Sequence, residues 1–131
     1  MTDGPHGVRH EQESVGTNIM NVAHPATCFP PAVTTASSWD PALAEAEGKA
    51  IAEEAKAQKI TTVLGPGVNI KRSPLCGRNF EYFSEDPLVA GIMGAAWVHG
   101  PKQEGGGPSL KPLCVTHHEH AGTITTHISH M

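Results

Sequence analysis

The sequence has few cysteines and no arrangement of them that would stabilise a small fold. Its 131 residues include three, Cys28, Cys76 and Cys114, far apart along the chain. An odd number at such spacing is typical neither of a disulfide framework nor of a zinc site, whose ligands come in close pairs. We therefore expect reduced, partly buried thiols, since free cysteine is among the most buried residue types.

Basic charge and long apolar runs are also scarce. Nine Lys and Arg against 13 Asp and Glu give a formal net charge of −4, which argues against nucleic acid as a partner. No apolar run approaches the roughly 20 residues that cross a bilayer, so we expect no membrane partner. The first ten residues, MTDGPHGVRH, lack the basic and then apolar pattern of a signal peptide. The sequence does not fix the compartment.

Histidine is abundant, mainly near the end of the chain. The stretch THHEHAGTITTHISHM contains Glu119 and five histidines, namely His117, His118, His120, His127 and His130. A His-X-His spacing beside a carboxylate can bind Zn²⁺ or Ni²⁺. However, no cysteine pair accompanies these residues, and no clear helix sets two histidines four positions apart. We predict neither a designed metal site nor a cofactor, and adventitious metal binding by this tail is the alternative.

Two segments carry the same helix-start chemistry. In WDPALAEAEGKAIAEEAKAQK, Asp40 suits the N-cap and Pro41 the first helical position. In EDPLVAGIMGAAWVHG, Asp86 and Pro87 play the same roles. The first helix shows an apolar stripe that predicts its buried face, made of Leu43, Ala46, Ala50 and Ile51. The second is apolar nearly all round, which predicts a well-buried helix.

Two short runs predict strands. ITTVL, residues 60–64, is β-branched and is expected to end at Gly65-Pro66-Gly67, and SLKPLCV, residues 109–115, follows the second helix. PKQEGGGP, between the second helix and the second of these strands, is expected to be a turn or linker. The order helix, strand, long loop, helix, strand is typical of an α/β fold with parallel strands. Such folds place their chemistry on loops at the carboxyl ends of strands, which is where the loop after Leu64 lies.

That loop, LGPGVNIKRSPLCGRNFEYFSEDP, resembles the corresponding loop of the family 3 glycoside hydrolases of the β-glucosidase type. MTDGPHGVR and TCFPPAVTTASSWDPALAEAEGKAIAEEA before it, and AGIMGAAWVHG and SLK after it, fit the same family in the same order. The resemblance covers residues 1–111. It implies a (β/α)8-type barrel domain, which in this family precedes a second α/β domain.

A whole barrel of this type needs about 200 residues or more. We therefore predict an α/β chain that holds three to four βα units of a TIM-type barrel in residues 1–111, followed by a divergent, irregular, His-rich tail in residues 112–131. The tail departs from the family pattern because Pro112 follows Lys111 where the family has histidine, and Gly122 stands where it has a sugar-binding arginine. One hypothesis is that this end has left the family's reading frame. Exposed sheet edges would make the isolated chain marginally stable.

The resemblance also implies an activity in carbohydrate metabolism. Family members remove β-linked sugars from the non-reducing end with retention of configuration, using an aspartate nucleophile and a glutamate acid/base. A retaining mechanism needs two carboxylates roughly 5 Å apart, and neither matches a position in this chain. We therefore expect a fragment of a β-glucosidase that is inactive alone, with a β-linked glucoside or oligosaccharide and the remainder of the enzyme as partners.

Three sugar-binding residues follow from the resemblance. Asp3 in TDGP matches an aspartate that accepts hydrogen bonds from glucose hydroxyls, Arg78 in GRNFE an arginine that binds the same sugar, and Lys111 in SLK a lysine of the family's Lys-His pair. Charge-assisted hydrogen bonds of this kind suit adjacent hydroxyls. Without the resemblance, Asp3 would simply open a turn, Arg78 would form a surface ion pair, and Lys111 would be solvated.

Other residues of the motifs receive structural roles. Arg72 and Glu81 are interpreted as ion-pair partners that brace the loop. Trp39 and Phe80 are expected to pack in the interior rather than stack on a sugar, as large aromatics usually do. Two other functions remain open, a non-catalytic carbohydrate-binding or interaction fragment and a histidine-rich metal-binding protein.

Overall fold

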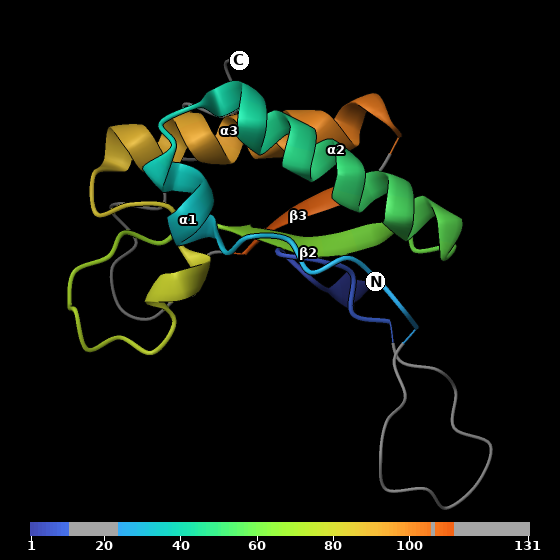
Figure 1. Cartoon of the computed structure of the whole chain (residues 1–131), viewed down its shortest axis with the longest axis horizontal. Coiled ribbons are helices and arrows are strands. Elements are labelled where there is room, and N and C mark those ends of the chain that lie inside the picture. Colours follow the sequence, from blue (N-terminus) through green and yellow to red (C-terminus); the bar gives the residue numbers. More distant parts are fainter. Residues whose placement is uncertain (11–23, 106, 112–131) are drawn as a thin grey trace, which may run out of the picture.

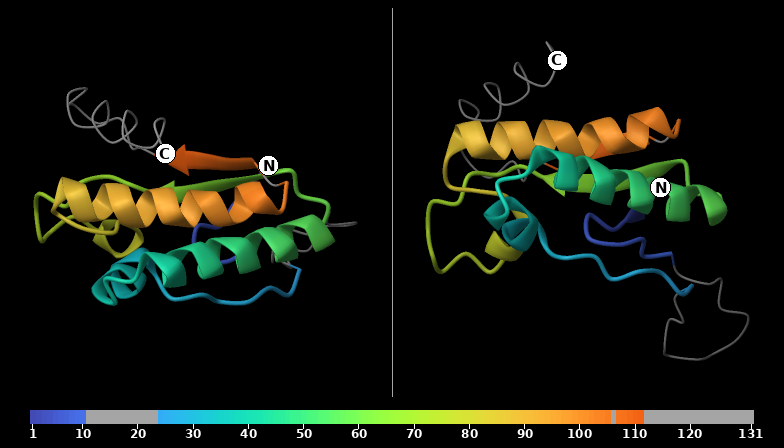
Figure 2. Two further views of the ribbon diagram at one scale, coloured as in Figure 1. Left: turned by 90° about the horizontal axis from the view of Figure 1, so that it is seen from above. Right: turned by 45° about the horizontal axis from the view of Figure 1, so that its top comes forward.

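A computed structural model gives the structure of the chain and describes residues 1–10, 24–105 and 107–111. The elements along these residues are β1 (Thr2–Asp3), α1 (Ala32–Ser37), α2 (Pro41–Ala57), β2 (Thr62–Gly67), the 3-10 turn η1 (Asn79–Glu81), α3 (Pro87–Gln103) and β3 (Gly107–Lys111). They form two layers, with α2 and α3 lying side by side over one face of the sheet (Figures 1 and 2). No helix among the described residues is long and apolar enough to cross a membrane.

The sheet confirms the predicted parallel arrangement. Its order is β1-β2-β3, and both neighbouring pairs are parallel. Asp3 lies opposite Leu64, and Gly67 opposite Lys111, so the carboxyl ends of all three strands lie at the same edge. Each described helix between two strands therefore returns the chain antiparallel to the sheet, as in a βαβ unit.

The predicted helix starts are confirmed at both long helices. The Asp40 carboxylate accepts a hydrogen bond from the backbone N–H of Ala42 at 2.9 Å, and Asp86 accepts one from Leu88 at the same distance. In both helices proline follows the cap. Each aspartate thus satisfies an N–H group that has no partner within its own helix.

Element boundaries differ from the prediction, and one short helix was not predicted. β2 does not end at Gly65 but continues to Gly67, because a register shift between Leu64 and Gly65 lets the pairing with β3 resume. α3 continues past Gly100 through Pro101 to Gln103, so the first three residues of the expected linker are helical. The turn-rich start of the chain contains the short helix α1, which no apolar period had indicated.

The helices α2 and α3 touch through their backbones. A β-carbon at Gly48 would overlap the carbonyl oxygen of Trp97, and one at Gly100 would overlap the carbonyl oxygen of Glu45. Pro101 has no N–H to bond to the Trp97 carbonyl four residues earlier, so that oxygen is left to face Gly48. The proline in α3 therefore lies where the two helices touch, and the carbonyl oxygen that it leaves without a helical partner faces α2.

Polar side chains hold the same two helices together at the surface. The Glu45 carboxylate on α2 lies 3.0 Å from Nδ1 of His99 and accepts a hydrogen bond from Gln103 at 2.9 Å. Lys49 forms an ion pair with Glu104 at 3.4 Å. Exposed pairs of this kind contribute little individually.

The buried faces of both helices differ from the predicted ones. On α2, Leu43 and Ala46 are exposed and Ala50 is half-buried, and only Ile51 of the predicted stripe is in the core. The buried residues are Ala44, Glu47, Gly48, Ile51, Ala52 and Ala55. On α3, Leu88 is 63% exposed, so this helix is not buried all round. Glu47 and Gly48 are buried although neither is counted as apolar in a sequence pattern. The predicted stripe therefore lay beside the face that is buried.

Glu47 is a buried carboxylate between α1 and α2. It is 8% exposed, and the Thr35 hydroxyl donates a hydrogen bond to it at 2.6 Å. Burial raises the pKa of Glu47 above its ordinary value of 4.5, and the hydrogen bond from Thr35 partly opposes that rise. The folded chain therefore binds a proton at Glu47 more readily than the unfolded chain does.

We predict that Gly48→Ala destabilises the chain while Gly91→Ala does not. The added methyl at 48 forces α2 and α3 apart, at a cost of about 1–3 kcal/mol, whereas Gly91 has open space around its Cα. At position 91 alanine should raise the free energy of unfolding by roughly 0.5–1 kcal/mol through helix propensity. Urea unfolding followed by circular dichroism measures both; equal effects would contradict the backbone contact.

A second prediction concerns pH. Because the pKa of Glu47 is raised in the folded state, its contribution to stability should fall as pH rises from 4.5 through the raised pKa. Glu47→Gln keeps an acceptor for Thr35 and removes the ionisation, so this slope should disappear in the variant, which should be at least as stable as the parent at neutral pH. Glu53→Gln, on the exposed face of α2, is the control. Unfolding at a series of pH values checks it, and an unchanged slope in Glu47→Gln would count against the prediction.

Candidate functional site

A cavity of about 380 Å³ lies at the carboxyl end of β1. Three segments that are distant in sequence form its walls: the turn after β1, the extended segment before α1, and η1. The lining residues are Asp3, Gly4, Pro5, His6, Gly7, Val8, Arg9, His24, Ala26, Thr27, Cys28, Phe80 and Glu81. This is the edge of the sheet at which the sequence predicted a site.

Asp3 is the last residue of β1 and contributes its carboxylate to this cavity. Arg9 lies 3.7 Å from that carboxylate and lines the cavity as well, a role that the sequence analysis missed. A tight turn returns the chain, since Gly7 N–H donates to Gly4 O at 3.3 Å and Arg9 N–H to Asp3 O at 3.1 Å. The two glycines of DGPHG, both at positive φ, are the signal that would have placed residue 9 beside residue 3.

Arg78 lies immediately before η1, and its Nε–H donates to the carboxylate of Glu81. That hydrogen bond is the main cause that raises the pKa of Arg78 above its ordinary value, and the charge of Asp3 adds to the rise. Asp3 and Arg78 are therefore within electrostatic reach of one another. Arg78 also lies over the ring of Tyr82, with 5.9 Å from Cζ to the ring centroid.

Glu81 connects Arg78 to the cavity. It is 5% exposed, yet it lines the cavity that Asp3 lines. Its predicted role as a brace of the loop is confirmed, although its partner is Arg78. Arg72, the other residue expected to brace the loop, is exposed.

Lys111 ends β3, and its side chain lies outside the described part of the structure. Its backbone lies opposite Gly67 of β2, and Gly67 also forms a parallel bridge with Tyr82. The backbones at 111, 67 and 82 are thus neighbours at the carboxyl ends of the strands. This places Lys111 at the same edge of the sheet as Asp3.

The aromatic residues and cysteines differ from the prediction. Phe80 is 52% exposed at the cavity and Trp39 is 75% exposed, so neither packs in the interior. Both lie at junctions, Phe80 in η1 and Trp39 between α1 and α2 at a φ of 58°. Cys28 and Cys76 are free and exposed rather than partly buried. Cys114 and the histidines of residues 112–131 lie outside the described residues.

His6 positions two walls of the cavity. Its Nε2 accepts a hydrogen bond from the backbone N–H of Ala32 at 3.0 Å, and its ring lies 5.9 Å from that of Phe80. Its carbonyl oxygen accepts from Phe29 N–H at 2.9 Å. The extended segment 24–31 is thereby fixed against the turn after β1.

Helix α2 holds the other side of that segment. The Glu54 carboxylate accepts hydrogen bonds from the hydroxyl of Thr27 and, at 3.1 Å, from its backbone N–H, and the Gln58 side chain donates to Pro25 O at 3.3 Å. The wall of the cavity is therefore attached to the helix layer and not only to the loops.

The groups that line the cavity match the chemistry of a neutral polyhydroxyl molecule. Asp3 and Glu81 supply carboxylate acceptors, Arg9 a guanidinium donor, and Phe80 an exposed apolar face. Charge-assisted hydrogen bonds to such groups are about twice as strong as neutral ones. Among the described residues there is no group of three potential metal ligands.

A parallel sheet with helices over one face and a cavity at the carboxyl ends of its strands is typical of an α/β chain of the TIM-barrel kind. The model of the glycosyl hydrolase family 3 N terminal domain matches residues 10–129. The chain belongs to this family of glycoside hydrolases, as the sequence predicted.

Curated relatives have different names within the family. The thermostable β-glucosidase B of Acetivibrio thermocellus is 49% identical over 120 residues, which are 92% of this chain and 16% of that protein. The exo-α-(1→6)-L-arabinopyranosidase of Bifidobacterium longum is 48% identical over 91% of this chain and 16% of its own length. The chain thus spans 16% of the length of these relatives.

Solved structures show the same fold. The β-glucosidase of Bifidobacterium adolescentis is 51% identical with a TM-score of 0.71, over 83% of this chain and 14% of that one. The β-glucosidase 3B of Thermotoga neapolitana, solved in complex with glucose, is 40% identical with a TM-score of 0.74, over 84% of this chain and 15% of that one.

We predict that Glu81→Ala destabilises the loop more than Glu85→Ala. Removal of Glu81 leaves the Arg78 guanidinium without its hydrogen-bond acceptor, which should lower the free energy of unfolding by about 1–3 kcal/mol. Glu85 is exposed, and its removal should change stability by no more than about 0.5 kcal/mol. Thermal unfolding of the three proteins under one buffer tests this, and equal Tm values for the two variants would refute it.

Proposed function

We propose that these residues form part of the glucose-binding site of a retaining β-glucosidase that hydrolyses O-glycosyl bonds of β-linked glucosides or oligosaccharides. The observation that carries the proposal is the single cavity that Asp3 and Glu81 line, with Arg78 bound to Glu81. The turn after β1 and η1, which form two walls of the cavity, lie at the carboxyl-end edge of the parallel sheet, where α/β enzymes bind substrate.

Each proposed ligand has a distinct task. Asp3 accepts hydrogen bonds from adjacent sugar hydroxyls, and Arg78, held in orientation by Glu81, donates to others. Lys111 donates from the end of β3. Arg9 restrains the Asp3 carboxylate, and Phe80 presents its ring to the apolar face of the sugar. The complex of the Thermotoga relative with glucose supports a hexose ligand for this fold.

The chemistry of hydrolysis is proposed to require residues beyond these 131. A retaining mechanism needs a nucleophile and an acid/base roughly 5 Å apart, and no carboxylate of the cavity is assigned to either task. The 131 residues alone should therefore bind sugar without turning it over, and the remainder of the enzyme is the proposed partner. Non-catalytic sugar recognition by the same cavity is the alternative function.

The sugar site is tested by Asp3→Asn. Ligand-detected NMR titration with methyl β-D-glucoside should show millimolar binding by the parent chain and at least a tenfold loss in Asp3→Asn, since the neutral amide removes the charge-assisted contact, worth about 1.5–3 kcal/mol. The control is Asp40→Asn, because asparagine caps a helix as well as aspartate does and Asp40 is far along the chain from the cavity. Equal binding by both variants would contradict a site at Asp3.

Turnover separates the two candidate functions. With a chromogenic β-glucoside, the chain alone should release no product above background. Added to the separately expressed remainder of a β-glucosidase relative, it should restore hydrolysis, and Asp3→Asn should abolish that restoration. Hydrolysis by the chain alone would overturn the assignment of the catalytic carboxylates to other residues, and failure of restoration alongside intact sugar binding would favour the non-catalytic alternative.

A further inference from the structure

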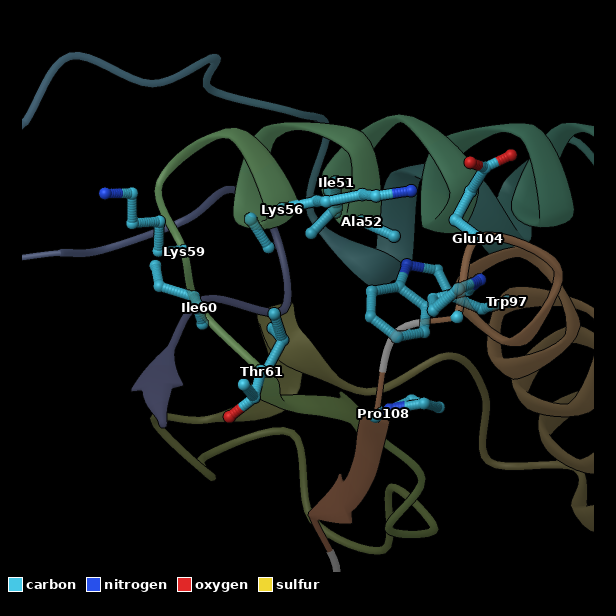
Figure 3. A pocket seen from close by; sticks show the side chains of 14 residues that line it. Ile51, Ala52, Lys56, Lys59, Ile60, Thr61, Trp97, Glu104 and Pro108 are labelled. Carbon is cyan, nitrogen blue, oxygen red and sulfur yellow. The ribbon is translucent and has the colours of Figure 1, made fainter.

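A second cavity, of about 370 Å³, lies at the opposite end of the strands. It is bordered by the junction from α2 to β2 and the junction from α3 to β3 (Figure 3). Its apolar walls include Ile51 of α2, Val63 of β2, Pro108 of β3 and the indole of Trp97 of α3. A flat apolar group of about ten heavy atoms fits a space of this size.

One hydrogen-bond donor at this apolar space is the indole N–H of Trp97. Trp97 is only 1% exposed, and among the described residues no acceptor takes a hydrogen bond from its indole N–H. In Figure 3 the indole nitrogen lies on the edge of the ring that faces α2. The indole nitrogen is not one of the buried polar atoms without a partner, so it is open to the cavity that Trp97 lines, and a ligand there can accept its hydrogen bond.

The mouth of the cavity has unbalanced positive charge. The Lys56 side chain extends along α2 toward the side on which Glu104 lies, whereas Lys59 points away (Figure 3). Glu104 already forms an ion pair with Lys49 at 3.4 Å. Among the described residues no carboxylate pairs with Lys56, so its ammonium is available to an anion bound at the mouth.

We propose that this cavity binds a small organic anion with a flat apolar body, an arenecarboxylate. The ring lies against Ile51, Val63 and the indole, and the carboxylate lies at the mouth, where it accepts hydrogen bonds from the Lys56 ammonium and the Trp97 N–H. A neutral hydrocarbon ring would fill the same space but would accept no hydrogen bond from either donor. Burial of the ring and neutralisation of one ammonium act together, because an ion pair beside apolar walls is less screened than one in water.

The proposal is independent of the sugar site. The two cavities share no lining residue and lie at opposite ends of the sheet. An anion bound here therefore competes with no sugar hydroxyl, and a failure of either proposal leaves the other unaffected.

Trp97 provides the signal for the test. The chain has two tryptophans, Trp39 and Trp97, and Trp39 is exposed. In a Trp39→Phe background all tryptophan emission comes from Trp97. Titration with benzoate should change this emission saturably, with a dissociation constant of about 1 mM for a ligand of this size. Benzyl alcohol, which has the same ring without the charge, should bind at least fivefold more weakly.

Two matched lysine variants test the recognition of charge. Lys56→Met should weaken benzoate binding about fivefold to tenfold and remove most of its dependence on salt, whereas Lys59→Met should leave affinity within twofold of the parent. Far-ultraviolet circular dichroism confirms that each variant is folded. No saturable response of Trp97, equal affinities for benzoate and benzyl alcohol, or equal losses in the two lysine variants would each overturn the proposal.

Discussion

The contact between the backbones of α2 and α3 is the constraint on which the rest of the fold depends. Gly48 and Gly100 bring the helices so close that no side chain fits between them, and Ile51 and Trp97 lie in one core cluster with Val63 of β2. Trp97 lies near Gly65, where a β-carbon would be 3.6 Å from its ring.

The candidate sugar site depends on the same layer, because its walls are attached to it. Glu54 of α2 holds Thr27, and His6 of the turn after β1 holds Ala32 at the start of α1. The polar groups of the cavity lie on loops, while the positions of those loops are set by a helix whose own position is fixed by its neighbour. Loops are in general the more mobile parts of a fold, and attachment to packed helices lets them hold binding groups in a defined geometry.

Local signals were read correctly from the sequence, and tertiary ones were not. The Asp-Pro helix starts follow from chemistry within a few residues, and the parallel order follows from the alternation of helices and strands along the chain. The buried face of α2 does not, because Glu47 becomes a core residue only when Thr35 is opposite it. The family motifs placed Asp3 and Arg78 at one edge of the sheet. They did not indicate that Arg9 returns to Asp3, although the glycines of the DGPHG turn carry that signal. Nor did they indicate that Phe80 is exposed, which depends on how two separate turns meet.

The charges at the two ends of the sheet favour different ligands. At the carboxyl ends, Asp3 is matched by Arg9 and Glu81 by Arg78, so two carboxylates and two guanidiniums balance, and a neutral ligand that offers both donors and acceptors replaces water there without leaving a charge unpaired. A sugar has that property and a phosphate or carboxylate does not. At the amino ends, Lys56 has no such counterpart among the described residues, and the walls are apolar. We therefore propose that the same two-layer scaffold discriminates by charge balance, with neutral polyols at one end and amphipathic anions at the other.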